Sequence, residues 1–157
     1  MPAPLVLSDL VFTKELNSSC FDEAKPLLEK HYQEIAHFKD IPLDPDWPAY
    51  IEMLKVGALR CYSARNSEGQ LVGYAVFVVR RALHYVTSIQ AFQDILFILP
   101  EYRGRGKKFI LWCDEQLKSE GVQLVYHHIK AEHNFGPMMK RIGYSLVDLI
   151  YYRRLDT

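Results

Sequence analysis

The chain has 157 residues, of which 49% are hydrophobic; this length suits one domain with its own core and is short for two. Its 19 basic and 19 acidic side chains give a formal net charge of zero, so no overall charge draws it to nucleic acid or an anionic membrane. No segment has the apolar length of a bilayer-spanning helix, and the N-terminus lacks the basic start of a signal peptide, so we expect a cytoplasmic protein without a membrane partner.

The first elements in chain order are a strand and a helix. Residues 5–14 have the β-branched and aromatic content of an opening strand. Ser19 followed by Asp22 resembles a capping box, and apolar residues then recur at helical spacing as far as Ile35. Because proline disrupts a helix interior, Pro26 either kinks this helix or marks its beginning.

A second helix is predicted to begin near Asp44 or Asp46 and to end near Gly57. Its apolar stripe consists of Trp47, Tyr50, Ile51 and Leu54. Two strands follow, Leu59–Arg65 and Leu71–Arg81, joined by a hairpin turn at residues 66–69. The second strand is almost wholly apolar, which predicts that both of its faces are covered.

The C-terminal half alternates strands and helices. An apolar run at 95–99 belongs to a central strand, which stops at Pro100, and after a short turn a helix runs from Lys107 to Gly121. The inward side of this helix is predicted to hold Phe109, Ile110, Cys113 and Leu117. The remaining elements are a strand at 124–129, a short helix at 135–142 and a closing strand at 144–155. This order indicates a mixed sheet with helices on both faces.

The turn between the central strand and its helix favours an anion site. Gly104 and Gly106 allow positive φ and the close approach of a ligand to the backbone, and the helix that follows adds unpaired N–H groups and its positive dipole end. Four cations crowd this end, where the dipole disfavours them unless an anion is bound: Arg103, Arg105, Lys107 and Lys108. We interpret the turn as a phosphate or pyrophosphate site, and the alternative is an ordinary turn with a solvated basic rim.

The flanking sequence resembles a known family. Residues 96–117, LFILPEYRGRGKKFILWCDEQL, resemble the acyl-CoA-binding motif of GNAT acyltransferases, an apolar strand followed by Arg/Gln-x-x-Gly-x-Gly/Ala and a helix. Arg103 fills the first position of that motif and Gly106 the fourth, whereas Lys108 stands where the family usually has Gly or Ala. Residues 133–144, HNFGPMMKRIGY, resemble the family's late helix. The sequence as a whole is similar to the sequences of small GNAT proteins of bacteriophage and bacterial genomes.

This resemblance implies a fold and an activity. The fold would be a single α/β (α+β) domain over residues 1–157, with a mixed, mostly antiparallel six- or seven-stranded sheet and helices on both faces. The activity would be N-acetyl transfer from acetyl-CoA, as cosubstrate, to a primary amine by direct attack, without a metal. The acceptor could be a small metabolite, a protein terminus or lysine, or an amine on a modified nucleobase, which is the one way in which nucleic acid would take part. A homodimer is compatible with the sequence.

The family's binding residues carry over position by position. Backbone groups of Phe97, Ile98 and Leu99 would bind the pantetheine arm, with the Ile98 N–H as the oxyanion donor. Backbone N–H groups from Arg103 to Lys108 (Arg103, Gly104, Arg105, Gly106, Lys107 and Lys108) would hold the pyrophosphate, and their cationic side chains could reach the 3′-phosphate. Asn134 would match the family's asparagine near the pantetheine.

The family's catalytic residues carry over less completely. Asp94 stands where several members place the acid that deprotonates the amine, although an aspartate there can also cap a turn or pair with an arginine. Many members use a tyrosine as general acid at the position of Met139. Tyr126 and His128 are the substitutes that we assign, from a group that also includes His127 and His133, because histidine is suited to proton transfer near neutral pH. Neighbouring His127 and His128 must face opposite sides of a strand.

Two further hypotheses stay open at this point. Asp40, Asp44 and Asp46 lie between the first two helices, where the family builds one wall of its acceptor site, and carboxylates there would suit a cationic amine; turn and cap roles are the alternative. The absence of the usual tyrosine and the presence of Lys108 are also compatible with a non-catalytic CoA-binding protein. A basic-loop nucleic-acid binder is the third option, to be recognised by salt-dependent affinity.

Overall fold

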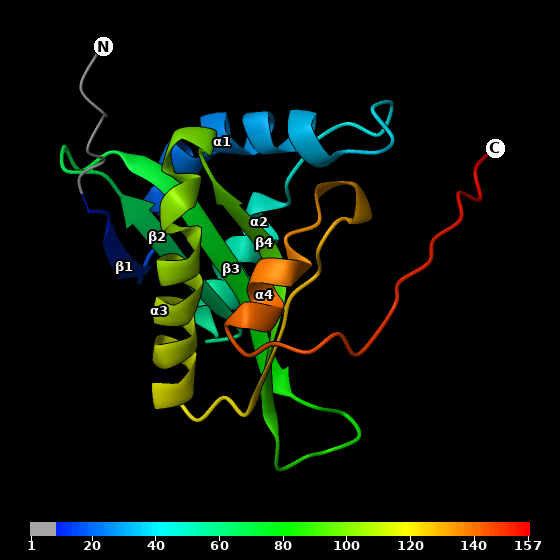
Figure 1. Cartoon of the computed structure of the whole chain (residues 1–157). Coiled ribbons are helices and arrows are strands. Elements are labelled where there is room, and N and C mark those ends of the chain that lie inside the picture. The colour runs from blue at the N-terminus through cyan, green and yellow to red at the C-terminus, as the bar shows by residue number, and fades with distance from the viewer. Residues whose placement is uncertain (1–8) are drawn as a thin grey trace.

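A five-stranded β-sheet forms the centre of the computed structural model, which describes residues 9–157 (Figure 1). The strands follow one another across the sheet in chain order. The first three neighbouring pairs are antiparallel, whereas β4 and β5 run parallel, so the sheet is mixed. The strands are β1 Val11–Glu15, β2 Leu59–Arg65, β3 Leu71–Arg81, β4 Ile89–Ile98 and β5 Leu124–Tyr126.

Helices lie on both faces of this sheet: α1 and α2 pack on one face, and α3 lies on the other (Figure 1). None of the helices within residues 9–157 has both the length and the apolarity of a membrane span. The helices are α1 Cys20–Ile35, α2 Trp47–Lys55, α3 Gly106–Ser119 and α4 Gly136–Arg141, with 3-10 turns η1 Pro100–Arg105 and η2 Ala131–His133.

The two N-terminal helices begin in different ways. α1 passes through Pro26, so the proline neither begins nor ends it, and Ser19 occupies the N-cap position without a capping hydrogen bond from its side chain. The capping box expected from Ser19 and Asp22 is therefore not formed. α2 follows the prediction, because the Asp46 side chain accepts a hydrogen bond of 3.0 Å from the Ala49 N–H.

The larger core lies between the sheet and α3. Phe109, Cys113 and Leu117 are fully buried there against Tyr62 and Phe77 of the sheet. Their spacing of four residues places them on one side of the helix, as the sequence predicted. Cys113 is thus a core residue.

The opposite face of the sheet carries two smaller cores. Leu27 of α1 packs with Tyr74 and Phe97, and Met53 of α2 packs against the cluster that contains Cys61. β3 therefore contributes side chains to both faces and is largely buried, as its apolar sequence predicted.

The number of strands and the extent of the two C-terminal strands were predicted wrongly within residues 9–157. The sheet has five strands instead of six or seven, and its β4–β5 pair is parallel. β5 ends at Tyr126, although the apolar pattern continued to residue 129. No strand forms at 144–155. The first part of the expected opening strand, residues 5–8, lies outside the described residues.

The segment after α4 runs away from the sheet as an extended chain (Figure 1). Its far end is held by Arg154, which donates hydrogen bonds of 2.8 and 2.6 Å to the two carboxylate oxygens of Asp40 in the loop between α1 and α2. Its large apolar side chains are exposed, with 71% of Leu146 and 70% of Leu149 accessible to solvent. Strand-like alternation alone did not produce a strand here, because no neighbouring strand pairs with this segment.

Candidate active site

A gap opens between β4 and β5 along the second half of β4. The two strands pair at only three positions, the last of which is Phe92 opposite Tyr126. β4 continues for six more residues, to Ile98, without a β5 partner. Beyond the last pair, the Gln93 side chain spans the two segments, with Oε1 at 2.7 Å from Nδ1 of His127. Backbone groups on this edge of β4 therefore have no β5 partner from Gln93 to Ile98.

The backbone of β4 directs one donor into this gap. The Leu99 N–H donates to the Val72 carbonyl on β3 at 2.9 Å, so it points away from the gap. Because N–H groups alternate sides along a strand, the N–H of Ile98 points toward the gap. The Ile98 side chain lies on the α3 side of the sheet, in the larger core.

Asp94 occupies a β-bulge of β4. Ile95 pairs with Val76 and Gln93 with Phe77, which leaves Asp94 as the extra residue between them. The Asp94 side chain is exposed, and Oδ2 accepts a short hydrogen bond from the hydroxyl of Tyr50 on α2. The bulge thus turns a carboxylate out of the sheet toward the α2 side, next to the gap.

Sequence reasoning placed Tyr50 on the apolar stripe of the second helix and missed its contact with Asp94. Burial raises the pKa of Tyr50, and the hydrogen bond and negative charge of Asp94 raise it further. The phenol is therefore protonated at neutral pH and acts as a hydrogen-bond donor. Helical spacing gave no signal for this role, since the partner carboxylate is 44 residues away.

The glycine turn differs from the expected geometry. Neither Gly104 nor Gly106 has a positive φ; Gly106 has φ −59° and ψ −40° and is the first residue of α3. A Cβ built at Gly104 meets no atom within 4 Å, and one at Gly106 meets only Ile98 Cδ1, at 3.7 Å. These glycines therefore provide open space at the beginning of α3, where the Gly106 N–H donates to the Arg103 carbonyl, instead of an unusual backbone conformation.

The four cations of the turn do not form one group. Arg103 donates to the Ile98 carbonyl at 3.1 Å and to Glu34 of α1 at 2.6 Å, so its side chain ties the turn to α1 and is engaged away from a phosphate. Nη2 of Arg105 lies 3.7 Å from Oδ1 of Asp9. Lys107 and Lys108 are exposed on the first turn of α3. Arg103 therefore faces Glu34 in this structure, and its expected contact with an anion stays a prediction.

The two proposed substitutes for the general acid lie beside the gap. Tyr126 pairs with Phe92 and stacks on its ring, with ring centroids 4.8 Å apart. His128 follows the end of β5; its side chain is exposed, and its carbonyl accepts a hydrogen bond of 3.4 Å from Nε2 of Gln93. Tyr126 is thus on the side of the sheet that also carries Asp94.

His127 faces the opposite side, toward Phe77 and Tyr144. Burial lowers the pKa of His127 to about 4, so the ring is neutral and its Nδ1–H donates to Gln93. Its Nε2 is buried and has no hydrogen-bond partner within the described residues. This histidine is part of the packing of the α3 face.

The segment around α4 supplies no proton donor at the expected position. Met139 is buried, with 3% of its surface exposed. Asn134 is exposed, and its Oδ1 accepts a hydrogen bond of 2.8 Å from the Gly136 N–H at the beginning of α4. The amide nitrogen of Asn134 can still donate to a ligand.

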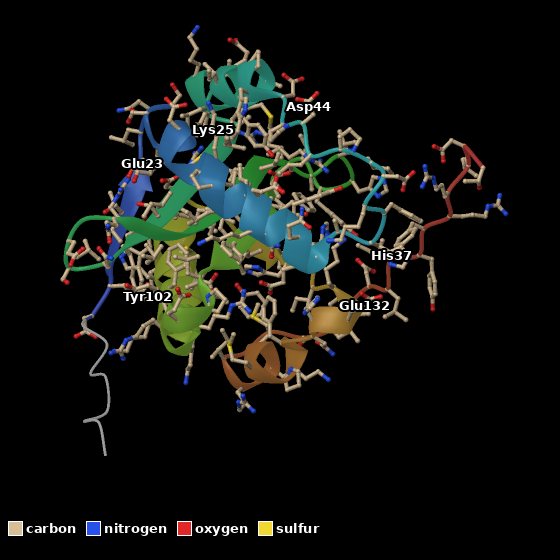
Figure 2. The ribbon with its side chains drawn as sticks, turned by 90° about the horizontal axis from the view of Figure 1, so that it is seen from above. Glu23, Lys25, His37, Asp44, Tyr102 and Glu132 are labelled. Carbon is tan, nitrogen blue, oxygen red and sulfur yellow. The ribbon has the colours of Figure 1, made fainter. Side chains whose placement is uncertain are left out.

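A cavity of about 520 Å³ adjoins the Tyr50–Asp94 pair. It lies between α1, α2 and the loop that joins them, over the face of β2, β3 and β4. Figure 2 shows α1 above the sheet, with Asp44 near α2. His37, which follows the C-terminal end of α1, lies beside Glu132. The loop between the helices therefore forms a wall of a cavity, as the family resemblance implied.

The three aspartates of this loop have different roles. Asp44 lines the cavity. Asp46 caps α2, and Asp40 binds Arg154. The expected cluster of carboxylates is thus reduced to one aspartate at the cavity.

A buried pair supports the floor of the cavity. His31 of α1 stacks on Phe97, with ring centroids 4.8 Å apart, and its Nδ1 lies 3.2 Å from the Tyr74 hydroxyl. Burial lowers the pKa of His31 to about 4 and raises the pKa of Tyr74. Both side chains are therefore uncharged at neutral pH and hold α1 against β3 and β4.

No protein-family model and no curated protein sequence matches the chain. Solved structures of GNAT acetyltransferases have the same fold. An aminoglycoside acetyltransferase from an uncultured soil metagenomic sample, meta-AAC0020 in complex with trehalose, superposes with a TM-score of 0.69 at 17% identity, over 93% of this chain and 97% of that chain. The ribosomal-protein-alanine N-acetyltransferase of Brucella melitensis biovar Abortus 2308 superposes with a TM-score of 0.69 at 17% identity, over 93% of this chain and 99% of that chain.

A structure of AAC(6')-Iy in complex with the bisubstrate analog CoA-S-monomethyl-acetylneamine gives a TM-score of 0.68 at 19% identity, over 94% of this chain and 99% of that chain. The shared fold extends over nearly the whole length of each protein. It covers the described sheet and helices, and the family resemblance of the central motif is consistent with it.

Proposed function

We propose that the chain is an N-acetyltransferase that moves the acetyl group of acetyl-CoA to a primary amine by direct attack. The observation that carries this proposal is the meeting of three features at the end of β4. They are the gap beside β5, the Ile98 N–H that points into the gap, and the Asp94 carboxylate in the bulge. Acyl transfer to an amine needs a positioned thioester, an oxyanion donor and a proton acceptor, and these features match the three needs.

The residues along the gap fit acetyl-CoA. Of the backbone groups at 97–99, the Ile98 N–H faces the gap and would pair with the pantetheine arm, whereas the Leu99 N–H is used by the Val72 carbonyl. The pyrophosphate would lie at the N–H groups that begin α3, in the space left by Gly104 and Gly106. Lys107 and Lys108 are exposed at this end and would supply positive charge for the phosphates. Arg103 would position the turn through Glu34 and Ile98.

Asp94 is the proton acceptor in this proposal. Its Oδ2 is held by Tyr50, and Oδ1 can take a proton from the amine, directly or through water. As the C–N bond forms, the Ile98 N–H stabilises the charge on the thioester oxygen. The C–S bond then breaks and the thiolate leaves, with Tyr126 or His128 as the candidate donors that neutralise it. A thiolate can also leave without help, because its pKa is far below that of an alcohol.

Calorimetric titration with acetyl-CoA, desulfo-CoA and ATP tests the binding half of the proposal. We expect the two CoA ligands to bind much more tightly than ATP, since the arm and the pyrophosphate both have partners on the chain. An amine screen with acetyl-CoA then tests turnover, by release of free thiol. Failure of both CoA ligands to bind would refute the proposal, and binding without acetyl transfer to any amine would leave only a CoA-binding protein.

A further inference from the structure

The cavity beside the Tyr50–Asp94 pair has a defined chemical character. Aromatic rings form two of its walls. Phe21 of α1 lies 5.5 Å from Trp47 and 6.2 Å from Tyr50, measured between ring centroids. On the other side, Phe38 of the α1–α2 loop lies 5.6 Å from Tyr152 of the C-terminal segment. A ligand in this cavity would lie between faces and edges of aromatic rings.

The charged groups that line the cavity are few. Glu15 is engaged within the protein, because its Oε1 accepts hydrogen bonds from Ser63 at 2.6 Å and from Arg65 at 3.0 Å. Asp44 and Lys130 are exposed at the entrance. An acceptor with many hydroxyl and ammonium groups would need a matching set of polar partners inside the cavity, since unpaired polar groups are costly to bury. This cavity offers mainly rings and aliphatic side chains.

The cavity also borders the proposed proton acceptor, through Tyr50 and Ile95. Tyr50 lines it with its ring and reaches Asp94 with its hydroxyl, and Ile95, the residue after Asp94, lies in its floor. An amine nitrogen at this end would be next to the carboxylate, while the rest of the molecule lay among the rings. A volume of about 520 Å³ is large enough for a molecule with one or two rings.

We propose that the acceptor is a primary amine on an apolar, aromatic body, with the body in the cavity and the nitrogen at Asp94. This inference rests on the function proposed above for the same site. It separates the chain from enzymes whose acceptors are polyhydroxylated amines.

Kinetics with a matched series of amines tests this inference. With acetyl-CoA saturating, 2-phenylethylamine is compared with ethanolamine and glucosamine. We expect kcat/KM for 2-phenylethylamine to be roughly 10- to 100-fold higher, because burial of a phenyl ring is worth about this factor. An equal or lower value than for glucosamine would overturn the inference and leave the proposed acetyl transfer intact.

A binding measurement keeps the test independent of turnover. The chain has two tryptophans, and Trp112 packs with Phe12 and Tyr62 on the α3 face, so Trp112→Phe leaves Trp47 as the single tryptophan and a reporter of the cavity. We expect 2-phenylethylamine to change its fluorescence in a saturable way, and glucosamine to have no such effect. Trp47→Phe is the control in which Trp112 should not respond. Absence of a saturable change at Trp47 would overturn the inference even if no amine is acetylated.

The C-terminal segment offers a matched pair of variants. Tyr152 lines the cavity and is 63% exposed, so its removal should not unfold the chain. We expect Tyr152→Ala to raise KM for 2-phenylethylamine several-fold, and by a larger factor than it raises KM for ethanolamine. Leu149→Ala removes a side chain of similar exposure that does not line the cavity, and it should change neither value. Equal effects of the two variants would contradict a role for Tyr152 in binding the aromatic body.

Discussion

The hydroxyl of Tyr50 on α2 donates a hydrogen bond to Oδ2 of Asp94 in the bulge of β4. This contact joins the helix that forms one side of the aromatic cavity to the strand that borders the gap beside β5. An amine in the cavity and a thioester in the gap would therefore meet at one carboxylate. Because Tyr50 fixes one oxygen of that carboxylate, it acts as a positioning residue in the proposed reaction.

Removal of this hydroxyl should affect turnover more than binding. Tyr50→Phe keeps the ring that packs on Phe21 and loses the hydrogen bond to Asp94. We expect kcat to fall by roughly tenfold, since a hydrogen bond to a charged group contributes about 1.5–3 kcal/mol, part of which water would replace. The dissociation constant of acetyl-CoA should not change. Tyr144→Phe is the control, because it removes a hydroxyl–carboxylate hydrogen bond on the α3 face.

Replacement of the carboxylate itself should be more severe. In Asp94→Asn, the amide oxygen can still accept the hydrogen bond from Tyr50, so the local structure should persist. We expect kcat to fall by roughly 100-fold or more, the typical contribution of a general base. Steady-state rates and acetyl-CoA titration would be measured on the same protein sample. Unchanged rates would discard Asp94 as the proton acceptor.

A methyl group at Gly106 should separate stability from binding. Gly106 has helical φ and ψ angles, and a Cβ there meets only one atom, at ordinary contact distance. Gly106→Ala should therefore leave stability unchanged or raise it by up to about 1 kcal/mol, and should lower acetyl-CoA affinity by filling the space at the helix N-terminus. Thermal melting and calorimetry measure the two effects. Gly69→Ala, at φ +78°, is the contrasting variant and should lower stability.

Acid should destabilise the fold through its buried histidines. The pKa of His31 is about 4 in the folded chain, below the value near 6.5 expected when the chain is unfolded. The unfolded chain therefore binds more protons in this interval, so stability is fully present above pH 6.5 and is lost as pH falls toward 4. For His31 the loss at about pH 5 should be about 2 kcal/mol. His127, with a pKa of about 4, should also lower the stability of the fold as the pH falls.

Urea unfolding at about pH 7 and about pH 5 measures this effect through the free energy of unfolding. His31→Gln keeps a polar contact for Tyr74 and does not titrate, so the difference between the two pH values should shrink. His84→Gln replaces an exposed histidine, so the difference in unfolding free energy between the two pH values should stay as in the parent chain. If His31→Gln and His84→Gln behave alike, His31 is not a source of the acid sensitivity.

The cysteines should be unreactive in the folded chain. Burial raises the pKa of Cys20 to about 11 and the pKa of Cys61 to about 12, and Cys113 is also raised by burial. Since the thiolate is the nucleophile, we expect slow reaction with a disulfide reagent near pH 8 and rapid reaction of all three thiols in denaturant. An acetyl-cysteine intermediate is then not expected, and initial-rate plots should intersect. Parallel plots, the kinetic sign of a covalent intermediate, would contradict direct attack.

Local sequence patterns predicted the parts of the fold that depend on nearby residues. The hairpin of β2 and β3, the end of β4 at a proline and the inward side of α3 followed from alternation, turn residues and helical spacing. The segment at 144–155 shows the limit of this reasoning. Its alternating pattern suits a strand, but a strand needs a neighbour, and the pattern contains no information on whether one is present.

For the candidate site, too, single positions could be proposed from the sequence, whereas contacts between distant residues could not. Asp94 could be proposed from its position in the central strand, whereas the bulge that turns it outward depends on the register between β3 and β4. Its contact with Tyr50 and the pairing of Arg103 with Glu34 join residues 44 and 69 positions apart. Contacts of this range depend on the packing of α1 and α2 onto the sheet, which no local pattern encodes.

The short pairing of β5 would link folding stability to the proposed cosubstrate. β4 and β5 share only three residue pairs, so the sheet lacks the hydrogen bonds that a longer parallel strand would make along the last six residues of β4. A pantetheine arm in the gap would supply hydrogen bonds in their place, as a temporary strand between β4 and the segment after Tyr126. By mass action, the folded chain would then gain RT ln(1 + [L]/Kd) of stability, so each change in cellular acetyl-CoA would also change how often this edge of the sheet opens.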